Sequence, residues 1–411
     1  MHLFILNFLL TVNSAGAMQP ADWNNISAGN PGYKKTEIPF LYKNGLLIVN
    51  VKINNVPLKF IFDTGAEHTI LLNKEIAGLL RLNILKSIDV YGADFNKKVK
   101  AYITSVVNVN LGGKYKKDIQ MLVLEEDVLA LSNDRYNTIH GILGSSFFSG
   151  TAIKIDYKKQ KLTVYGDENY STKGFRQLPA FFDRHRPLIK AKITTGTTDS
   201  LKYVNLLMDT GSSVPLILLS SLDSLQKMNI KIIRGKIGTG IGGDLEGWIS
   251  TVKTLCLGQY CFSNLICKFQ ELDSIKTETL SKFRNGLTGN GLLEHFDIII
   301  DYRKEKVFAK ARHKRLKNPG YDKSGLTLVA GGKNLNRYFI KHVIPGSPAD
   351  KAGLKPGDEI YSVQCLHRVF WSLERIVKLL KKHEGKRIKM KIIRNGKKIK
   401  VSFRLKDMFK D

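Results

Sequence analysis

The first 310 residues consist largely of short apolar or alternating segments, each bounded by Gly, Asn or Asp. This pattern is typical of short β-strands joined by tight turns. The segment LLIVNVKINNVPLKFIFDTG, residues 46–65, predicts a β-hairpin that turns at Asn54-Asn55 and continues into a strand ending at Asp63. Short helices are expected at 73–80 and 220–227. The pattern therefore predicts a mainly β fold over this part of the chain.

The pattern changes after residue 310. Residues 310–325, KARHKRLKNPGYDKSG, are polar and basic and contain Pro319-Gly320, as expected of a linker. Beyond it, a helix is predicted from Leu373, Ile376, Val377 and Leu380 at helical spacing. Two strands, at 387–393 and 399–405, are expected to be joined by a turn at Asn395-Gly396. A small α/β domain should therefore follow the β region.

The β region also repeats itself. FIFDTGAEHTILL (60–72) and LLMDTGSSVPLILL (206–219) share an apolar pair, Asp-Thr-Gly and an apolar run. Each is followed by a Gly-apolar-x-Gly element, an apolar stretch and Ile-Asp-Tyr. Three pairs of landmarks lie 145 or 146 residues apart: Asp63 and Asp209, Gly141 and Gly286, Asp156 and Asp301. Such agreement indicates an internal duplication.

The duplicated Asp-Thr-Gly has a chemical meaning. A carboxylate at the end of an apolar strand is costly unless it is paired or hydrogen-bonded. The glycine allows a sharp turn that brings backbone N–H groups to the carboxylate, and the Thr hydroxyl can bond across to the other copy. Two copies related by a pseudo-two-fold axis would place Asp63 and Asp209 face to face. The pair would then share one proton, leaving one general base and one proton donor.

These two segments resemble the active-site loops of aspartic peptidases, the first the retroviral (retropepsin) type and the second the pepsin type. Ile142–Gly144 and Leu287–Gly289 match the family's element behind each loop, with Thr288 departing from its apolar middle position. The resemblance covers Lys43 to Lys310. It implies a two-lobed duplicated β fold with a central cleft, and peptide hydrolysis by an activated water without metal or cofactor. It assigns catalysis to Asp63 and Asp209, and support of the loops to Thr64, Gly65, Thr210, Gly211 and Ser212.

The same family closes hairpin flaps over its substrate. Residues 90–103 and 237–250 lie where the two flaps would belong. The flap candidates are Tyr91, Gly92, Gly242 and Gly243, since glycines allow a mobile tip and close backbone approach. Tyr91 could equally be an ordinary strand residue. His68, shortly after the first Asp-Thr-Gly, is interpreted as structural rather than catalytic.

The C-terminal region resembles a PDZ domain over residues 325–406, most specifically in GSPADKAGLKPGDEI, residues 346–360. PDZ domains bind an extended peptide as an added strand, usually at its C-terminus. The resemblance places the loop for the peptide carboxylate at four residues: Gly325, Leu326, Thr327 and Leu328. A rigid structural appendage is the alternative reading of this module.

Charge alters this picture little. The chain has 411 residues, a formal net charge of +29 and an isoelectric point near 9.8. Acidic partners are therefore favoured in general. However, the lysines are scattered, and neither an RNA-binding motif nor a zinc-knuckle spacing is present. Nucleic acid is excluded as the main partner, and a membrane surface is possible but not expected.

The N-terminus favours export. Residues 1–17 contain a short apolar stretch and Ala15-Gly16-Ala17, which resembles a signal-peptide cleavage site. The expected location is periplasmic or extracellular. In that setting Cys256 could pair with Cys261 or with Cys267, and free buried thiols are the alternative.

Taken together, the predicted organisation is a signal peptide (1–17), an N-terminal segment (18–42), two aspartic peptidase lobes (43–168 and 169–310), a basic linker (311–324) and a PDZ domain (325–406). The predicted function is an exported aspartic endopeptidase whose PDZ domain binds a substrate or partner peptide. The alternative is an inactive peptide-binding scaffold of the same fold. Because both Asp-Thr-Gly motifs lie in one chain, a monomer is expected.

Overall fold

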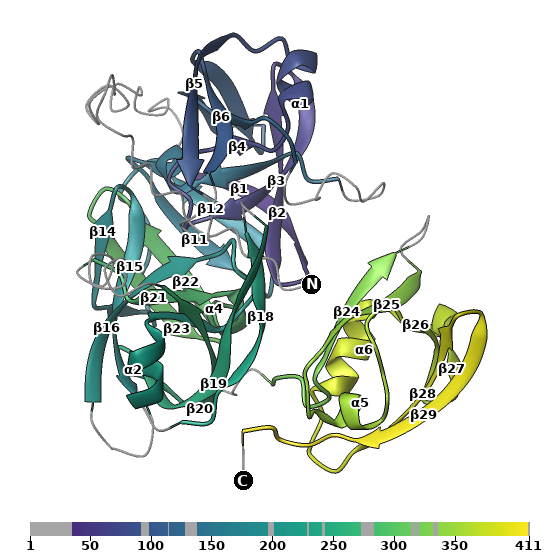
Figure 1. Cartoon of the computed structure of the whole chain (residues 1–411). Helices are drawn as coiled ribbons and strands as arrows, with labels where there is room; N and C mark the ends of the chain where they lie inside the picture. Colours follow the sequence, from purple (N-terminus) through teal and green to yellow (C-terminus); the bar gives the residue numbers. More distant parts are fainter. Residues whose placement is uncertain are drawn as a thin grey trace. The chain divides into compact units, whose positions relative to one another are not determined.

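The computed structural model describes residues 35–91, 98–113, 115–127, 138–195, 201–227, 230–240, 243–272, 283–313, 316, 320–331 and 336–409. The expected signal peptide therefore lies outside the described residues. The chain divides into two compact units, one containing most residues up to 317 and the other containing residues 318–411 (Figure 1). No helix in the described ranges is both long and apolar enough to span a bilayer.

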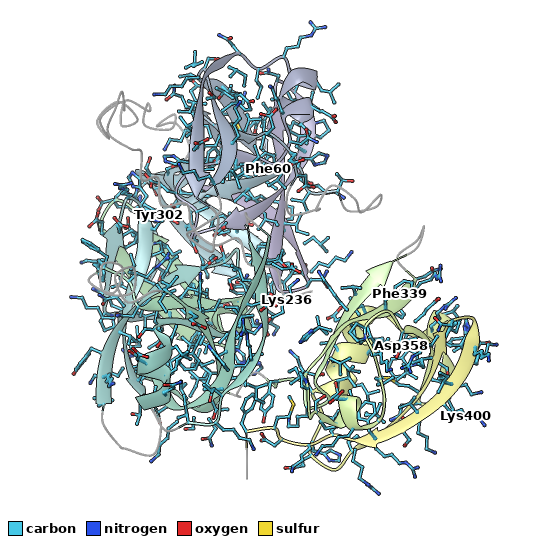
Figure 2. All side chains as sticks on the ribbon, in the orientation of Figure 1. Phe60, Lys236, Tyr302, Phe339, Asp358 and Lys400 are labelled. Carbon is cyan, nitrogen blue, oxygen red and sulfur yellow. A yellow bond between two sulfur atoms is a disulfide. The ribbon has the colours of Figure 1, made fainter. Side chains whose placement is uncertain are left out.

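The first copy of the repeat is almost entirely β. It packs the alternating residues of the predicted hairpin into a core that includes the fully buried Phe60 (Figure 2). Its elements are β1 (Lys35–Lys43), β2 (Leu46–Ile53), β3 (Val56–Asp63), β4 (Ile70–Leu71), α1 (Lys74–Leu79), β5 (Ile84–Tyr91), β6 (Lys98–Thr104), β7 (Val107–Leu111), β8 (Tyr115–Ile119), β9 (Leu122–Leu124), β10 (Gly141–Gly144), the 3-10 helix η2 (Ser145–Phe148), β11 (Ala152–Asp156) and β12 (Lys161–Tyr165).

The second copy repeats this order with longer strands. Its elements are β13 (Arg176–Leu178), β14 (Ala180–Asp183), β15 (Arg186–Thr194), β16 (Leu201–Asp209), β17 (Leu216–Ser220), α2 (Leu222–Lys227), β18 (Ile233–Gly240), β19 (Gly243–Leu257), β20 (Tyr260–Glu271), β21 (Gly286–Gly289), α4 (Asn290–Leu293), β22 (Phe296–Asp301) and β23 (Lys306–Ala311). A disulfide joins Cys256 to Cys261 across the β19–β20 hairpin, whereas Cys267 is buried and free.

Several local predictions are confirmed. The β2–β3 hairpin turns at Asn54 and Asn55, which both adopt positive φ angles of 48° and 65°. A short polar side chain tolerates this left-handed conformation best after glycine. Helix α1 occupies the predicted range, and the side chain of Asn73 caps it by accepting a hydrogen bond from the N–H of Glu75 at 2.6 Å. Helix α2 begins two residues later than predicted.

The two copies are joined by strand pairing. β11 of the first copy runs antiparallel to β22 of the second, with Ile155 opposite Ile298. On either side, β12 pairs with β1 and β23 pairs with β13, so matching strands of the duplication form one sheet. Part of the expected N-terminal segment is thus strand β1. Backbone hydrogen bonds and a shared hydrophobic core fix the two copies relative to each other.

The second unit contains one sheet in the order β24-β25-β26-β28-β29, with β27 paired to β26. Figure 1 shows α5 and α6 on one side of this sheet, and their apolar residues form its core with the sheet. The predicted helix and strand pair are confirmed by α6, β28 and β29. The elements are β24 (Leu326–Gly331), β25 (Arg337–Val343), α5 (Pro348–Lys351), β26 (Glu359–Val363), β27 (Leu366–His367), the 3-10 helix η3 (Arg368–Phe370), α6 (Leu373–Leu380), β28 (Arg387–Arg394) and β29 (Lys397–Arg404).

Candidate active site

The structure brings Asp63 and Asp209 together. They are the last residues of β3 and β16, and both side chains are fully buried. A Cβ added at Gly65 would lie 2.8 Å from the carboxyl carbon of Asp209, and one added at Gly211 would overlap the carboxyl group of Asp63. Each loop glycine therefore makes room for the carboxyl group of the other copy. No larger residue fits at either position without moving an aspartate.

The two threonines lock the loops to each other. The N–H of Thr64 donates to Oγ1 of Thr210 at 3.0 Å, and the N–H of Thr210 donates to Oγ1 of Thr64 at 3.1 Å. Each hydroxyl in turn donates across the interface, from Thr64 to the carbonyl of Met208 and from Thr210 to that of Phe62. The hydrogen bonds that the sequence led us to expect are thus present in both directions. All four groups are buried, so breaking one would leave polar atoms unpaired.

A glycine-containing strand supports each loop from behind. β10 runs parallel to β3 with Gly144 opposite Asp63, and β21 runs parallel to β16 with Gly289 opposite Asp209. A Cβ at Gly289 would lie 2.5 Å from the carbonyl oxygens of Ser212 and Val214, so the backbones can approach only because no side chain intervenes. The hydroxyl of Thr288, the departure from the family pattern, donates to the carbonyl of Pro215 at 3.1 Å. It therefore ties the second loop in place.

Sequence reasoning missed Asn290, which is fully buried directly after β21. Its Nδ2 donates to the carbonyls of Thr210 at 2.6 Å and Gly45 at 2.7 Å. Its Oδ1 accepts from the hydroxyl of Tyr157 in the first copy. Asn290 occupies the same position of the repeat as Ser145, whose hydroxyl donates to the carbonyl of Ala66 within the first copy. The repeat thus pointed to the position of Asn290 but not to its partners.

The two carboxyl groups have unequal surroundings. Oδ1 of Asp63 accepts hydrogen bonds from the N–H groups of Gly65 at 2.7 Å and Ala66 at 3.1 Å. Within the described ranges, both oxygens of Asp209 are buried without a hydrogen bond of ordinary geometry. Burial raises the pKa of Asp63 to about 6, against the effect of its N–H donors. Burial, and then the charge of Asp63, raise the pKa of Asp209 well above its ordinary value.

Charged residues also lie close to one another just after the first Asp-Thr-Gly motif. Glu67 lies 4.0 Å from Arg184 and 3.6 Å from His68, and burial raises its pKa while Arg186 and Arg184 lower it. Burial, followed by the two arginine charges, lowers the pKa of His68 to about 3. His68 therefore stays neutral at ordinary pH. In the part of the chain that the structure describes, no group of three or more His, Cys, Asp or Glu side chains is placed to hold a metal ion.

The flap candidates are only partly described. β5 and β6 form a hairpin where the first flap was expected, and Tyr91 ends β5. Gly92 and Gly242 lie outside the described residues. Gly243 begins β19 with a positive φ of 116°, which favours glycine. Nearby, the indole N–H of Trp248 donates to Glu271 at 2.9 Å.

In the second unit, three of the four expected carboxylate-binding residues lie in β24, at one end of the sheet order, and Gly325 directly precedes this strand. The loop before it already holds a carboxylate of its own. Oδ1 of Asp322 accepts from the N–H groups of Ser324 at 3.0 Å, Gly325 at 2.7 Å and Leu326 at 3.3 Å. A peptide carboxylate seeking the N–H groups of Gly325 and Leu326 would have to compete with Asp322.

Comparisons with known proteins agree with this architecture. Residues 49–147 match the family model of aspartyl proteases, and residues 339–394 match that of PDZ domains. The chain thus carries an aspartyl protease domain and a C-terminal PDZ domain. The matched protease segment contains Asp63 but ends before Asp209, so the family match covers only the first copy of the repeat.

Two individual proteins also match parts of this chain. The probable 26S proteasome regulatory subunit p27 of Saccharomyces cerevisiae is 23% identical over 191 residues, which are 45% of this chain and 81% of that protein. The carboxy-terminal processing protease CtpB of Bacillus subtilis is 43% identical over 75 residues, 18% of this chain and 16% of that protein. The chain thus spans only a small part of the second relative.

Proposed function

We propose that this protein is an aspartic endopeptidase that uses Asp63 and Asp209 as one catalytic pair. The observation that carries the proposal is the buried meeting of the two carboxyl groups at ends of equivalent strands, locked by reciprocal threonine hydrogen bonds. The aspartyl protease match over the first copy supports the same class. The substrate class is a polypeptide bound in a cleft between the two copies, beneath the predicted flaps.

The unequal hydrogen bonding of the two carboxyl groups supports a starting protonation state in which Asp209 carries the proton. The N–H donors of Gly65 and Ala66 stabilise a negative charge on Asp63. Among the described residues, neither oxygen of Asp209 has a hydrogen bond of ordinary geometry, so Asp209 holds the shared proton. Asp63 then takes a proton from a water as it attacks the peptide carbonyl, and Asp209 donates its proton to the carbonyl oxygen. In the collapse of the tetrahedral intermediate, Asp63 gives its proton to the leaving amine, and Asp209 recovers its own.

We further propose that the protein acts after export, as a monomer, with the PDZ domain positioning a peptide along β24. The Cys256–Cys261 disulfide fits an oxidising compartment. The duplicated motif supplies both aspartates from one chain, which removes the need for a dimer. A peptide added beside β24 would use strand pairing for affinity, and its carboxylate would compete with Asp322 for the loop.

The test is cleavage of a reduced, alkylated protein between pH 3 and 8 by wild type, Asp63→Asn and Asp209→Asn. Both variants should lose at least a thousandfold in rate, since each removes half of the pair. Asp156→Asn, the same change at the end of β11, is the matched control and should cleave normally. A folded wild type that never cleaves would instead favour the inactive peptide-binding scaffold.

A further inference from the structure

One face of the PDZ sheet carries a concentration of positive charge that the proposed peptidase activity does not use. Residues 320–411 contain 22 Lys or Arg against 8 Asp or Glu. The alternation along β28 buries Ile388, Met390 and Ile392 and exposes the residues between them. We call the following exposed set the cationic face: Arg387, Lys389 and Lys391 on β28, and Lys398, Lys400 and Arg404 on β29.

The strand register places these positive charges opposite one another, and no described carboxylate pairs with them. Arg387 lies opposite Arg404, and Lys391 lies opposite Lys400. Like charges directly opposite each other destabilise an antiparallel pair. Within the described residues, the six cations make no ion pair; Arg387 donates to Ser402 Oγ, Arg404 to the carbonyl of Gly385, and Lys398 lies 4.1 Å from the centre of the Tyr361 ring. Folding alone therefore does not explain this arrangement.

The neighbouring strand adds no free negative charge. Glu359 on β26 accepts hydrogen bonds from both Arg337 and Arg368, so its charge is already balanced. Helices α5 and α6 cover the opposite side of the sheet, and Figure 2 shows Lys400 on the outer strand away from them. The cationic face is thus open to solvent, and no described carboxylate of this unit forms an ion pair with it.

Exposed apolar residues border this face. Leu366, Val369 and Phe370 are 52%, 61% and 65% exposed in the segment that forms β27 and η3. This segment belongs to the same side of the sheet, because the ring of His367 meets that of Tyr361 at 4.8 Å and Lys398 lies over the same tyrosine. Cations beside exposed Phe, Val and Leu are the combination that binds the headgroup and acyl boundary of an anionic bilayer.

We propose that the cationic face docks the protein on an anionic phospholipid surface, with Val369 and Phe370 entering the interface. Nucleic acid would also neutralise the lysines, but it gives the three exposed apolar side chains no apolar partner. Docking would hold the peptidase near substrates at a membrane. The proposal does not depend on whether the Asp63/Asp209 pair is active.

The experiment is co-sedimentation of the full chain with vesicles at about 0.1 M salt, where exposed charges still act over roughly 10 Å. One set of vesicles is phosphatidylcholine alone, and the other contains about a third phosphatidylglycerol. The wild type should bind only the anionic vesicles. Lys389→Glu/Lys391→Glu should bind at least tenfold more weakly, since each surface cation contributes roughly fivefold. Val369→Ser/Phe370→Ser should also weaken binding.

The matched control is Lys52→Glu/Lys116→Glu, which changes the net charge equally at exposed positions of β2 and β8 in the other unit. It should stay within about twofold of the wild type, as expected if the location of the charge matters. Equal losses in both double variants would overturn the proposal in favour of net charge alone. Absence of binding to anionic vesicles, equal binding to neutral ones, or displacement by duplex DNA with no effect of the apolar variant would also overturn it.

Discussion

The two Asp-Thr-Gly loops share a motif but are held in different ways. In the first copy, Asp63 accepts hydrogen bonds from two backbone N–H groups, and Ser145 of the same copy supports the loop by donating to the carbonyl of Ala66. In the second copy, neither oxygen of Asp209 has a hydrogen bond of ordinary geometry within the part of the chain that the structure describes, and Asn290 ties its loop to both copies. The duplication therefore preserved the geometry of the pair, while its surroundings diverged. In the proposed mechanism, this difference makes Asp63 the proton acceptor and Asp209 the proton donor.

The largest effect should come from the support of the second loop. Asn290→Ala removes three buried hydrogen bonds and should lower the free energy of unfolding by about 3–5 kcal/mol. Ser145→Ala, the matching change in the first copy, should cost about 1 kcal/mol. Urea unfolding of both variants measures the difference. Equal losses would mean that the two loops are supported alike.

Removing either threonine hydroxyl of the reciprocal hydrogen bonds between Thr64 and Thr210 should lower the free energy of unfolding by a similar amount. Thr64→Val and Thr210→Val each leave one N–H and one carbonyl unpaired in the buried interface, and each should cost about 2–4 kcal/mol. Thr151→Val, which loses a single bond to the carbonyl of Phe148, is the control and should cost about 1 kcal/mol. Thermal unfolding at constant pH would show a much larger loss in one variant if the lock were one-sided.

The pH dependence of stability should separate the two aspartates. Since the folded-state pKa values lie above the ordinary ones, the folded protein binds protons more tightly than the unfolded chain, and stability falls as pH rises from about 4 through 6 and above. Asp209→Asn removes the group with the larger shift. Its free energy of unfolding should exceed that of the wild type at pH 7, with little gain at pH 4.

Asp63→Asn provides the contrast, because it leaves Asp209 buried and should retain most of the pH dependence. Denaturant titrations of both variants at pH 4, 5.5 and 7 make the measurement. A difference from the wild type that does not change with pH would show that burial does not hold the shared proton. The cleavage rate should follow the opposite trend and decline below about pH 6, because protonation of Asp63 there removes the general base.

The smallest effect is expected at the departure from the family pattern. Thr288→Val keeps the shape of the side chain and removes one hydrogen bond to Pro215, so it should cost about 1 kcal/mol and slow cleavage only slightly. The matching first-copy change, Leu143→Thr, places a hydroxyl in an apolar core and should cost more, about 2–3 kcal/mol. If Thr288→Val were neutral, its hydroxyl would have no supporting role.

Much of the fold and part of the candidate site could be predicted from local sequence patterns. The hairpin turn at Asn54-Asn55 and the helices α1 and α6 depend on residues close in sequence, so local sequence patterns predicted them. The duplication was visible because matching landmarks kept one offset. By contrast, the bond of Asn290 to Gly45 joins residues 245 positions apart. No periodicity or spacing signals such a contact.

The sequence by itself determined the strands, the duplicated Asp-Thr-Gly and the division into a protease-like region and a PDZ domain, because these depend on local propensity and repeated pattern. Tertiary structure alone decided which aspartate receives N–H donors, which buried amide ties the copies together and which lysines share one face of a sheet. Those properties depend on burial and on strand register, and both arise only when distant segments pack against each other.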